Sequence, residues 1–176
     1  MDIFEFAMRK EQDAEKLYRD LASRVGDGGR KTILTRLADA ERKHAEVVAA
    51  LREETGGDLP ADFPEEPGKL LEKLAEDRSQ VVVESERHVD VYRKARDMEQ
   101  ESVELYREQS EKAGNPLHQR IFRQLMEQEK MHYILLDNML DFVMMPESWC
   151  EDAEFSHIID KYRGTAYYPG LSEYEA

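Results

Sequence analysis

Apolar residues recur along most of the chain with the spacing of amphipathic helices. In four long segments they lie three or four positions apart, which places them on one face of a helix. Gly26, Gly28 and Gly29 are expected to end the first segment, and Gly56 and Gly57 the second; Gly114-Asn115-Pro116 separates the last two. The pattern predicts four helices in two consecutive hairpins, at residues 2–25, 30–54, 87–112 and 117–143.

The connection between the two hairpins is long and combines a predicted loop, a short helix and an apolar segment. Residues 58–67 contain three prolines and predict a loop, and a short helix is expected at residues 68–76. Val81-Val82-Val83 has the composition of a strand. Its flanks are strongly charged and no second strand is evident, so a helical lead into the third long helix is favoured.

These elements predict an all-α fold, a four-helix bundle with a long crossover between its second and third helices. Residues 1–145 would form the bundle. Residues 146–176 would add a short helix and an extended tail, packed on the bundle or on a partner chain.

Six ionisable residues interrupt the apolar faces of the four helices. Three of them recur 88 positions later, and in each hairpin the first two glutamates are 30 positions apart. An unpaired carboxylate is costly inside a protein, so repeated acids at core positions indicate that cations neutralise them. The six residues are Glu11, Glu41, His44, Glu99, Glu129 and His132.

The repeat extends beyond these six residues. Other identical pairs at the same offset are Ala7 and Ala95, Gln12 and Gln100, Leu17 and Leu105, Tyr18 and Tyr106, Ile33 and Ile121, and Leu37 and Leu125. Two hairpins of one sequence type predict a bundle with an internal pseudo-twofold axis.

Two Glu-x-x-His motifs indicate the chemistry of the repeated residues. In Glu41-Arg42-Lys43-His44 and in Glu129-Lys130-Met131-His132 the two polar residues share a helix face. One such pair arises by chance in charged helices, but two pairs, each 30 residues after a core glutamate, form a specific pattern. The pattern matches the known ligand set of di-iron carboxylate bundles.

The charge balance agrees with a two-metal site. Four carboxylates balance two divalent ions while the histidines bind as neutral imidazoles. Mixed carboxylate and imidazole ligands suit iron, manganese or zinc. By symmetry, Glu41 and Glu129 are expected to bridge the metals, and Glu11 and Glu99 to bind one metal each.

Two tyrosines follow the first glutamate of each hairpin. Tyr18 and Tyr106 lie seven residues after Glu11 and Glu99, on the same helix faces. A buried phenol needs a hydrogen-bond partner. Each tyrosine is therefore expected to act at the catalytic centre by donating to a ligand carboxylate from the other hairpin; the alternative is an ordinary place in an aromatic core.

Composition narrows the classes of function. The net charge of −14 over 176 residues argues against nucleic-acid binding. The sequence shows neither a signal-peptide pattern nor an apolar run long enough to cross a membrane, so a cytoplasmic protein is expected. Cys150 is the only cysteine, which excludes an internal disulfide and a four-cysteine metal site within these residues.

The motifs resemble those of the rubrerythrin-like branch of the ferritin-like superfamily over residues 1–143. They are Glu11 with Tyr18, Glu41-x-x-His44, Glu99 with Tyr106, and Glu129-x-x-His132. The resemblance implies a ferritin-like bundle with two iron ions that react with hydrogen peroxide or dioxygen. It also implies a homodimer or a larger assembly.

Two departures from that family limit what the resemblance implies. Rubrerythrins often append a rubredoxin-like domain with four cysteines; none is expected here, so a separate electron donor protein or a small reductant would supply electrons. They also tend to carry an additional glutamate three residues after the third-helix ligand. Ser102 occupies that position, so the ligand exchange made by that glutamate does not carry over.

Two other functions stay open at this point. The site could bind iron for storage or delivery, with ferroxidase but no peroxidase turnover. Alternatively, the chain could be a helical interaction module that docks through its tail, with the charged residues pointing at water.

Overall fold

The computed structural model describes residues 2–26, 28–54, 67–76 and 86–144, and the four predicted long helices lie in it with ends within two residues of those expected. The predicted helical lead at residues 81–83 and the tail at 146–176 lie outside the described residues. The helices are α1 (Ile3–Arg24), α2 (Gly29–Arg52), α3 (Pro67–Glu76), α4 (Glu86–Lys112) and α5 (Pro116–Met144).

Local capping explains where α1 and α5 begin. The Asp2 carboxylate accepts a hydrogen bond from the backbone N–H of Phe4 at 3.1 Å and caps α1. Asn115 does the same for Leu117 at 2.9 Å, with Pro116 as the first residue of α5. The predicted break between the last two long helices is therefore confirmed.

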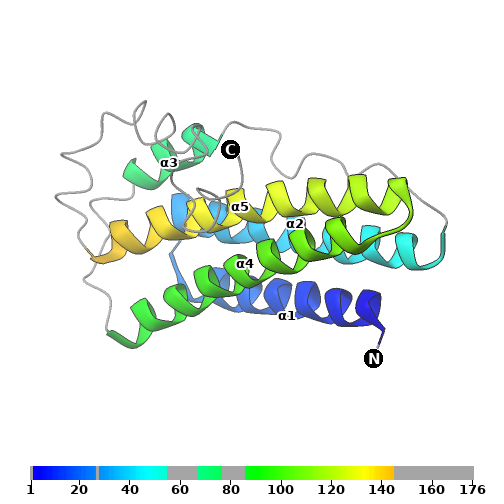
Figure 1. The fold of residues 1–176 in the computed structure, drawn as a ribbon. Helices are drawn as coiled ribbons and strands as arrows, with labels where there is room; N and C mark the ends of the chain where they lie inside the picture. The colour runs from blue at the N-terminus through cyan, green and yellow to red at the C-terminus, as the bar shows by residue number, and fades with distance from the viewer. Residues whose placement is uncertain (1, 27, 55–66, 77–85, 145–176) are drawn as a thin grey trace.

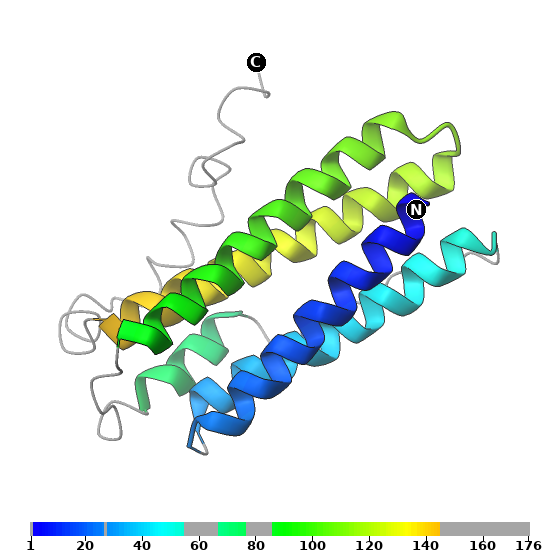
Figure 2. The ribbon, with the colours of Figure 1, turned by 90° about the horizontal axis from the view of Figure 1, so that it is seen from below.

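The four long helices form two antiparallel hairpins that lie side by side (Figures 1 and 2). α1 packs on α2, and α4 packs on α5. α2 ends at one end of the bundle and α4 begins at the other, so α4 runs in the same direction as α2 (Figure 1). The all-α four-helix bundle with a long crossover is confirmed. Among the described residues, no helix combines the length and apolar sequence needed to span a bilayer.

The apolar core consists of two clusters that flank the polar centre of the bundle. One cluster contains Leu37 of α2 and Leu136 of α5, and the other contains Val48 of α2 and Leu125 of α5. The Glu-x-x-His motifs lie between these positions on both helices. Apolar side chains therefore separate the ionisable residues from water at both ends.

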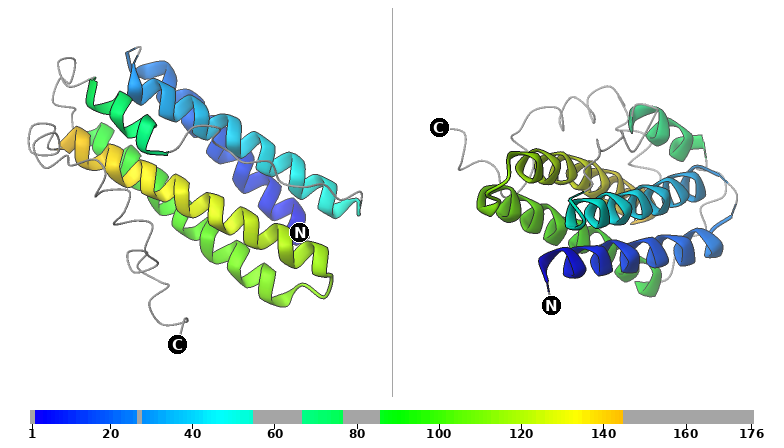
Figure 3. Two further views of the ribbon diagram at one scale, coloured as in Figure 1. Left: turned by 90° about the horizontal axis from the view of Figure 1, so that it is seen from above. Right: turned by 90° about the vertical axis from the view of Figure 1, so that its right-hand side faces the viewer.

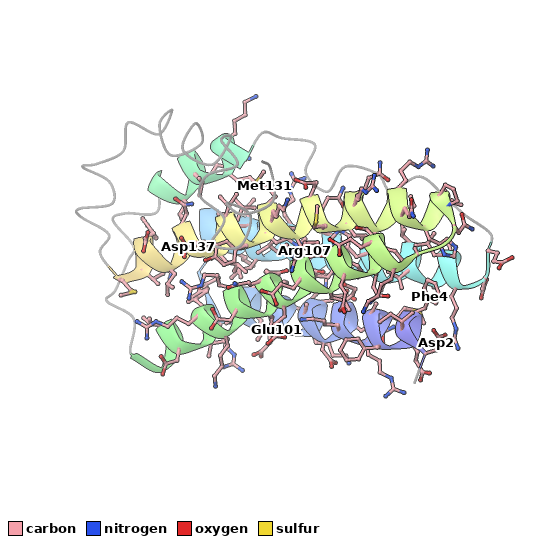
Figure 4. All side chains as sticks on the ribbon, in the orientation of Figure 1. Asp2, Phe4, Glu101, Arg107, Met131 and Asp137 are labelled. Carbon is pink, nitrogen blue, oxygen red and sulfur yellow. The ribbon has the colours of Figure 1, made fainter. Side chains whose placement is uncertain are left out.

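Polar side chains link neighbouring helices at the surface. The Lys10 ammonium of α1 donates to the backbone carbonyl of Met98 at 3.0 Å and lies 3.2 Å from the Glu101 carboxylate, both on α4. Within the second hairpin, Arg96 pairs with Asp137 at 3.0 Å. Figure 4 shows Glu101 beside α1 and Asp137 beside α4. The Lys10 contacts connect the two hairpins across the seam between α1 and α4.

The short helix α3 covers one end of α2 and α5 (Figure 3). Its Leu70, Leu71 and Leu74 are fully buried in the larger apolar cluster. The sequence pattern counted Gly29 among the residues that end the first helix, but Gly29 is the first residue of α2. A Cβ atom there would lie 2.4 Å from the Lys73 carbonyl oxygen, so the backbone of α3 requires glycine at this position.

Replacing Gly29 tests this close approach. Gly29→Ala should lower the free energy of unfolding by about 1–3 kcal/mol, because the new methyl group meets backbone that cannot rotate away. Gly114→Ala is the matched control, since a Cβ atom at Gly114 meets nothing within 4 Å. Urea denaturation of both variants measures the difference, and equal stabilities would contradict the packing of α3 on α2.

Candidate metal centre

The two Glu-x-x-His motifs meet at the middle of the bundle. Glu41 and His44 come from α2, Glu129 and His132 come from α5, and all four are fully buried. One ligand atom of each residue lies within 4.8 Å of those of the other three. The imidazole rings are nearly parallel, with centroids 5.3 Å apart. Two helices far apart in sequence thus supply one compact group of metal-binding atoms.

Glu41 and Glu129 each direct one oxygen toward each histidine. Oε1 of Glu129 lies 2.7 Å from Nδ1 of His44, and its Oε2 lies 3.3 Å from Nδ1 of His132. Oε1 of Glu41 lies 2.8 Å from Nδ1 of His132, and its Oε2 lies 3.4 Å from Nδ1 of His44. This is how a carboxylate shared by two metals would lie, and it supports a bridging role for both glutamates.

Glu11 and Glu99 lie on the outer sides of this group, each beside one histidine. Oε2 of Glu11 lies 3.8 Å from Nδ1 of His44, and Oε2 of Glu99 lies 3.8 Å from Nδ1 of His132. Both carboxylates are almost completely buried. The structure therefore brings together all six residues that the sequence singled out, in two sets related by the pseudo-twofold axis.

Each tyrosine reaches the opposite hairpin. The Tyr18 hydroxyl of α1 donates to Oε1 of Glu99 on α4, and the Tyr106 hydroxyl of α4 donates to Oε1 of Glu11 on α1. Both phenols are fully buried. The sequence predicted a ligand carboxylate of the other hairpin as the acceptor for each tyrosine, without distinguishing between the two glutamates there; the structure shows that the acceptors are Glu99 and Glu11. With Oε1 held by a phenol, Oε2 of each glutamate is left facing its histidine.

The outer glutamates favour their protonated forms in the metal-free protein. Burial, followed by the charge of Glu129, raises the pKa of Glu99 to about 8. The same two causes, in the same order, raise the pKa of Glu11 well above its ordinary value. Without a cation, these two carboxylates avoid the cost of a buried charge by holding protons.

The inner glutamates favour their ionised forms. Burial opposes ionisation, but the imidazoles of His44 and His132 outweigh it and hold the pKa of Glu129 well below its ordinary range. Burial and the charge of Glu129 act against ionisation of Glu41, yet the charge of His132 and the neighbouring carboxyl group of Glu11 leave the pKa of Glu41 lowered. The bridging candidates are therefore already charged at neutral pH.

The residues present fit a pair of divalent metal ions. Within the described part of the chain, all four carboxylate oxygens of Glu41 and Glu129 are buried and accept no hydrogen bond of good geometry. Each unsatisfied buried polar group costs about 1–3 kcal/mol. Metal ions between these oxygens and the imidazole nitrogens would remove that cost, and this donor set suits iron, manganese or zinc.

One contact at the site was not foreseen from the sequence. Nε2 of His44 lies 2.9 Å from Oε1 of Gln128, the residue before Glu129. The equivalent residue in the first hairpin is Ala40, which precedes Glu41. A comparison of the two halves of the repeat beside the ligand positions would have revealed this difference.

Comparison with known proteins agrees with this geometry. The rubrerythrin family model matches residues 2–140, which include the whole site. No curated protein and no solved structure matches the chain.

The raised pKa of Glu99 makes the stability of the metal-free protein depend on pH. Its pKa of about 8 in the folded protein lies above the ordinary value of 4.5, so the stability that protonation contributes is fully present below pH 4.5. That contribution is lost as the pH rises through 8. Metal-free protein should therefore lose stability over this range, as urea denaturation with a chelator present can measure.

Glu99→Gln provides the control for this pH dependence. Its amide is uncharged at every pH and can still accept the hydrogen bond from Tyr18, so the decline should be shallower. Metal-free Glu99→Gln should then be the more stable protein at pH 8. Parallel curves for the variant and the original chain would contradict the assignment to Glu99.

Proposed function

The chain belongs to the rubrerythrin family, and we propose that it is a non-haem di-iron oxidoreductase that reduces hydrogen peroxide or dioxygen. The observation that carries the proposal is the arrangement of Glu41 and Glu129. Each is buried without a hydrogen bond and faces both histidines. Buried charges of this kind are stabilised when metal ions lie between them.

Two iron ions are the proposed cofactor, with manganese or zinc as alternatives. Glu11 and His44 would hold one ion, Glu99 and His132 the other, and Glu41 and Glu129 would be shared. When bound as iron(II), the pair supplies two electrons, which convert hydrogen peroxide and two protons into two water molecules while both irons become iron(III).

The protein's own contribution is orientation and exclusion of water. Tyr18 and Tyr106 hold the outer glutamates from the opposite hairpin. Burial and the charge of Glu11 raise the pKa of Tyr106 well above its ordinary value, so the phenol keeps the proton that it donates. We propose that both tyrosines act at the catalytic centre by fixing these carboxylates.

Ser102 favours a second candidate function, iron(II) oxidation for storage or delivery. It is buried one turn after Glu99, where rubrerythrins tend to carry an additional glutamate. A serine at this position cannot provide the carboxylate that would exchange with a histidine. Ferroxidase chemistry with dioxygen does not need that exchange.

The proposed partners follow from the same chemistry. A separate electron donor protein would return the iron to iron(II) after each turnover, and a homodimer is the proposed assembly. We propose a cytoplasmic protein without nucleic-acid or membrane partners, in keeping with its net charge of −14.

Iron oxidation kinetics test the enzymatic function. Anaerobic protein loaded with iron(II) should form iron(III) rapidly on mixing with hydrogen peroxide. Glu41→Ala and Glu129→Ala should slow this by at least about 100-fold, since residues that merely support metal ligands already contribute 10–100-fold. Stopped-flow absorbance measures the rates. The same experiment with dioxygen in place of peroxide tests the ferroxidase alternative, which predicts that iron(II) is oxidised faster by dioxygen than by peroxide.

Glu127→Gln is the matched control for these kinetics. Glu127 lies on α5 two residues before Glu129, but it is exposed and pairs with Lys130. Its replacement should leave the rate unchanged. Oxidation no faster than that of iron(II) in buffer would overturn the enzymatic proposal.

Chelation separates a metalloprotein from a helical interaction module. A ligand at 100 times its dissociation constant stabilises a protein by about 2.7 kcal/mol, so removal of metal should lower the thermal midpoint of unfolding. The Glu41→Ala, Glu129→Ala double variant should show no such response. Calorimetry with and without chelator measures the midpoints of the original chain and of the double variant. The same midpoint for the original chain in both conditions would favour the interaction module.

A further inference from the structure

The two halves of the site differ at one residue that contacts a histidine. Gln128 of α5 precedes Glu129, and its repeat equivalent in α2, Ala40, precedes Glu41. The side-chain carbonyl oxygen of Gln128 lies 2.9 Å from Nε2 of His44. This contact joins the two hairpins, because His44 lies on α2.

The hydrogen bond determines which imidazole nitrogen can bind a metal. A carbonyl oxygen only accepts, so Nε2 of His44 must carry the proton and donate it. In the neutral imidazole, which is the form that binds a metal, Nδ1 then keeps its lone pair. Nδ1 is also the nitrogen that lies 2.7 Å from Oε1 of Glu129 and 3.4 Å from Oε2 of Glu41. A hydrogen bond at the second nitrogen fixes both the tautomer and the ring orientation of a histidine ligand.

The pseudo-twofold axis does not provide the same bond at the other histidine. The residue equivalent to Gln128 is Ala40, whose methyl group cannot accept a proton from Nε2 of His132. The His132 ring has no side-chain amide at the position that Gln128 occupies relative to His44. The residue at this repeat position can therefore orient His44 but not His132.

We propose that Gln128 is a positioning residue that prepares His44, and not His132, for one of the two metal ions. The inference rests on the proposed function, since it requires a two-metal site. Gln128 acts through His44, so its loss weakens the position next to Glu11 and leaves the position next to Glu99 and His132 nearly unaffected.

Zinc binding to three variants tests this inference. In Gln128→Leu, one of two zinc affinities should fall by about 10–100-fold, the usual effect of losing the partner of a histidine ligand. Gln128→Glu keeps an acceptor and should restore that affinity. Gln124→Leu removes an exposed amide one turn earlier on α5 and should change neither affinity. Calorimetric titration resolves the two binding steps.

Nitrogen NMR supplies a readout that simple loss of packing would not reproduce. In metal-free and zinc-loaded protein, Nε2 of His44 should carry a slowly exchanging proton. The signal should disappear in Gln128→Leu and persist in Gln128→Glu, because only the latter keeps an acceptor for it.

The outcomes separate this inference from the function on which it rests. Original protein that binds no zinc would overturn both. Two bound zinc ions with unchanged affinities in Gln128→Leu, or with both affinities weakened equally, would overturn only the role of Gln128.

Discussion

The rest of the structure depends on one constraint, the burial of four carboxylates between two apolar clusters. None of the four is more than 2% exposed. Without cations, loss of hydration and mutual repulsion force protons onto Glu11 and Glu99, while the neighbouring imidazoles keep Glu41 and Glu129 ionised. Two divalent ions would replace both the protons and the imidazole charges. The helices, the tyrosines and the apolar ends hold a polar centre that helix packing alone does not stabilise.

Neither hairpin can form this centre without the other. Each bridging glutamate faces the histidine of its own helix and that of the opposite hairpin. Each tyrosine donates to a glutamate on the opposite hairpin. The site thus lies at the interface between the two copies of the sequence repeat, and α4 runs antiparallel to α1 beside it (Figure 1). The fold and the site stabilise each other for this reason.

The repeat made most of this arrangement predictable. The spacing of apolar residues and the positions of glycines predicted the helices. The repeat at an offset of 88 positions predicted the six ionisable residues and a ligand carboxylate of the opposite hairpin as the acceptor for each tyrosine. The rest depends on distances between elements that no local pattern encodes. Gly29 fits the pattern of a glycine that ends a helix. The structure shows instead that a residue without a side chain is needed there, because the backbone of α3 at Lys73, 44 residues later in the chain, lies against it. The contact from Gln128 to His44 depends on the rotation of α5 relative to α2, and it breaks the symmetry on which the sequence argument relied.

The most direct test of the central claim is a crystal structure of the iron-loaded protein with diffraction data collected at the iron absorption edge. The account predicts two anomalous peaks in each chain, both touching Glu41 and Glu129, with one beside Glu11 and His44 and the other beside Glu99 and His132. Carboxylates that turn toward solvent, or that meet only other protein groups with no peak between them, would contradict it.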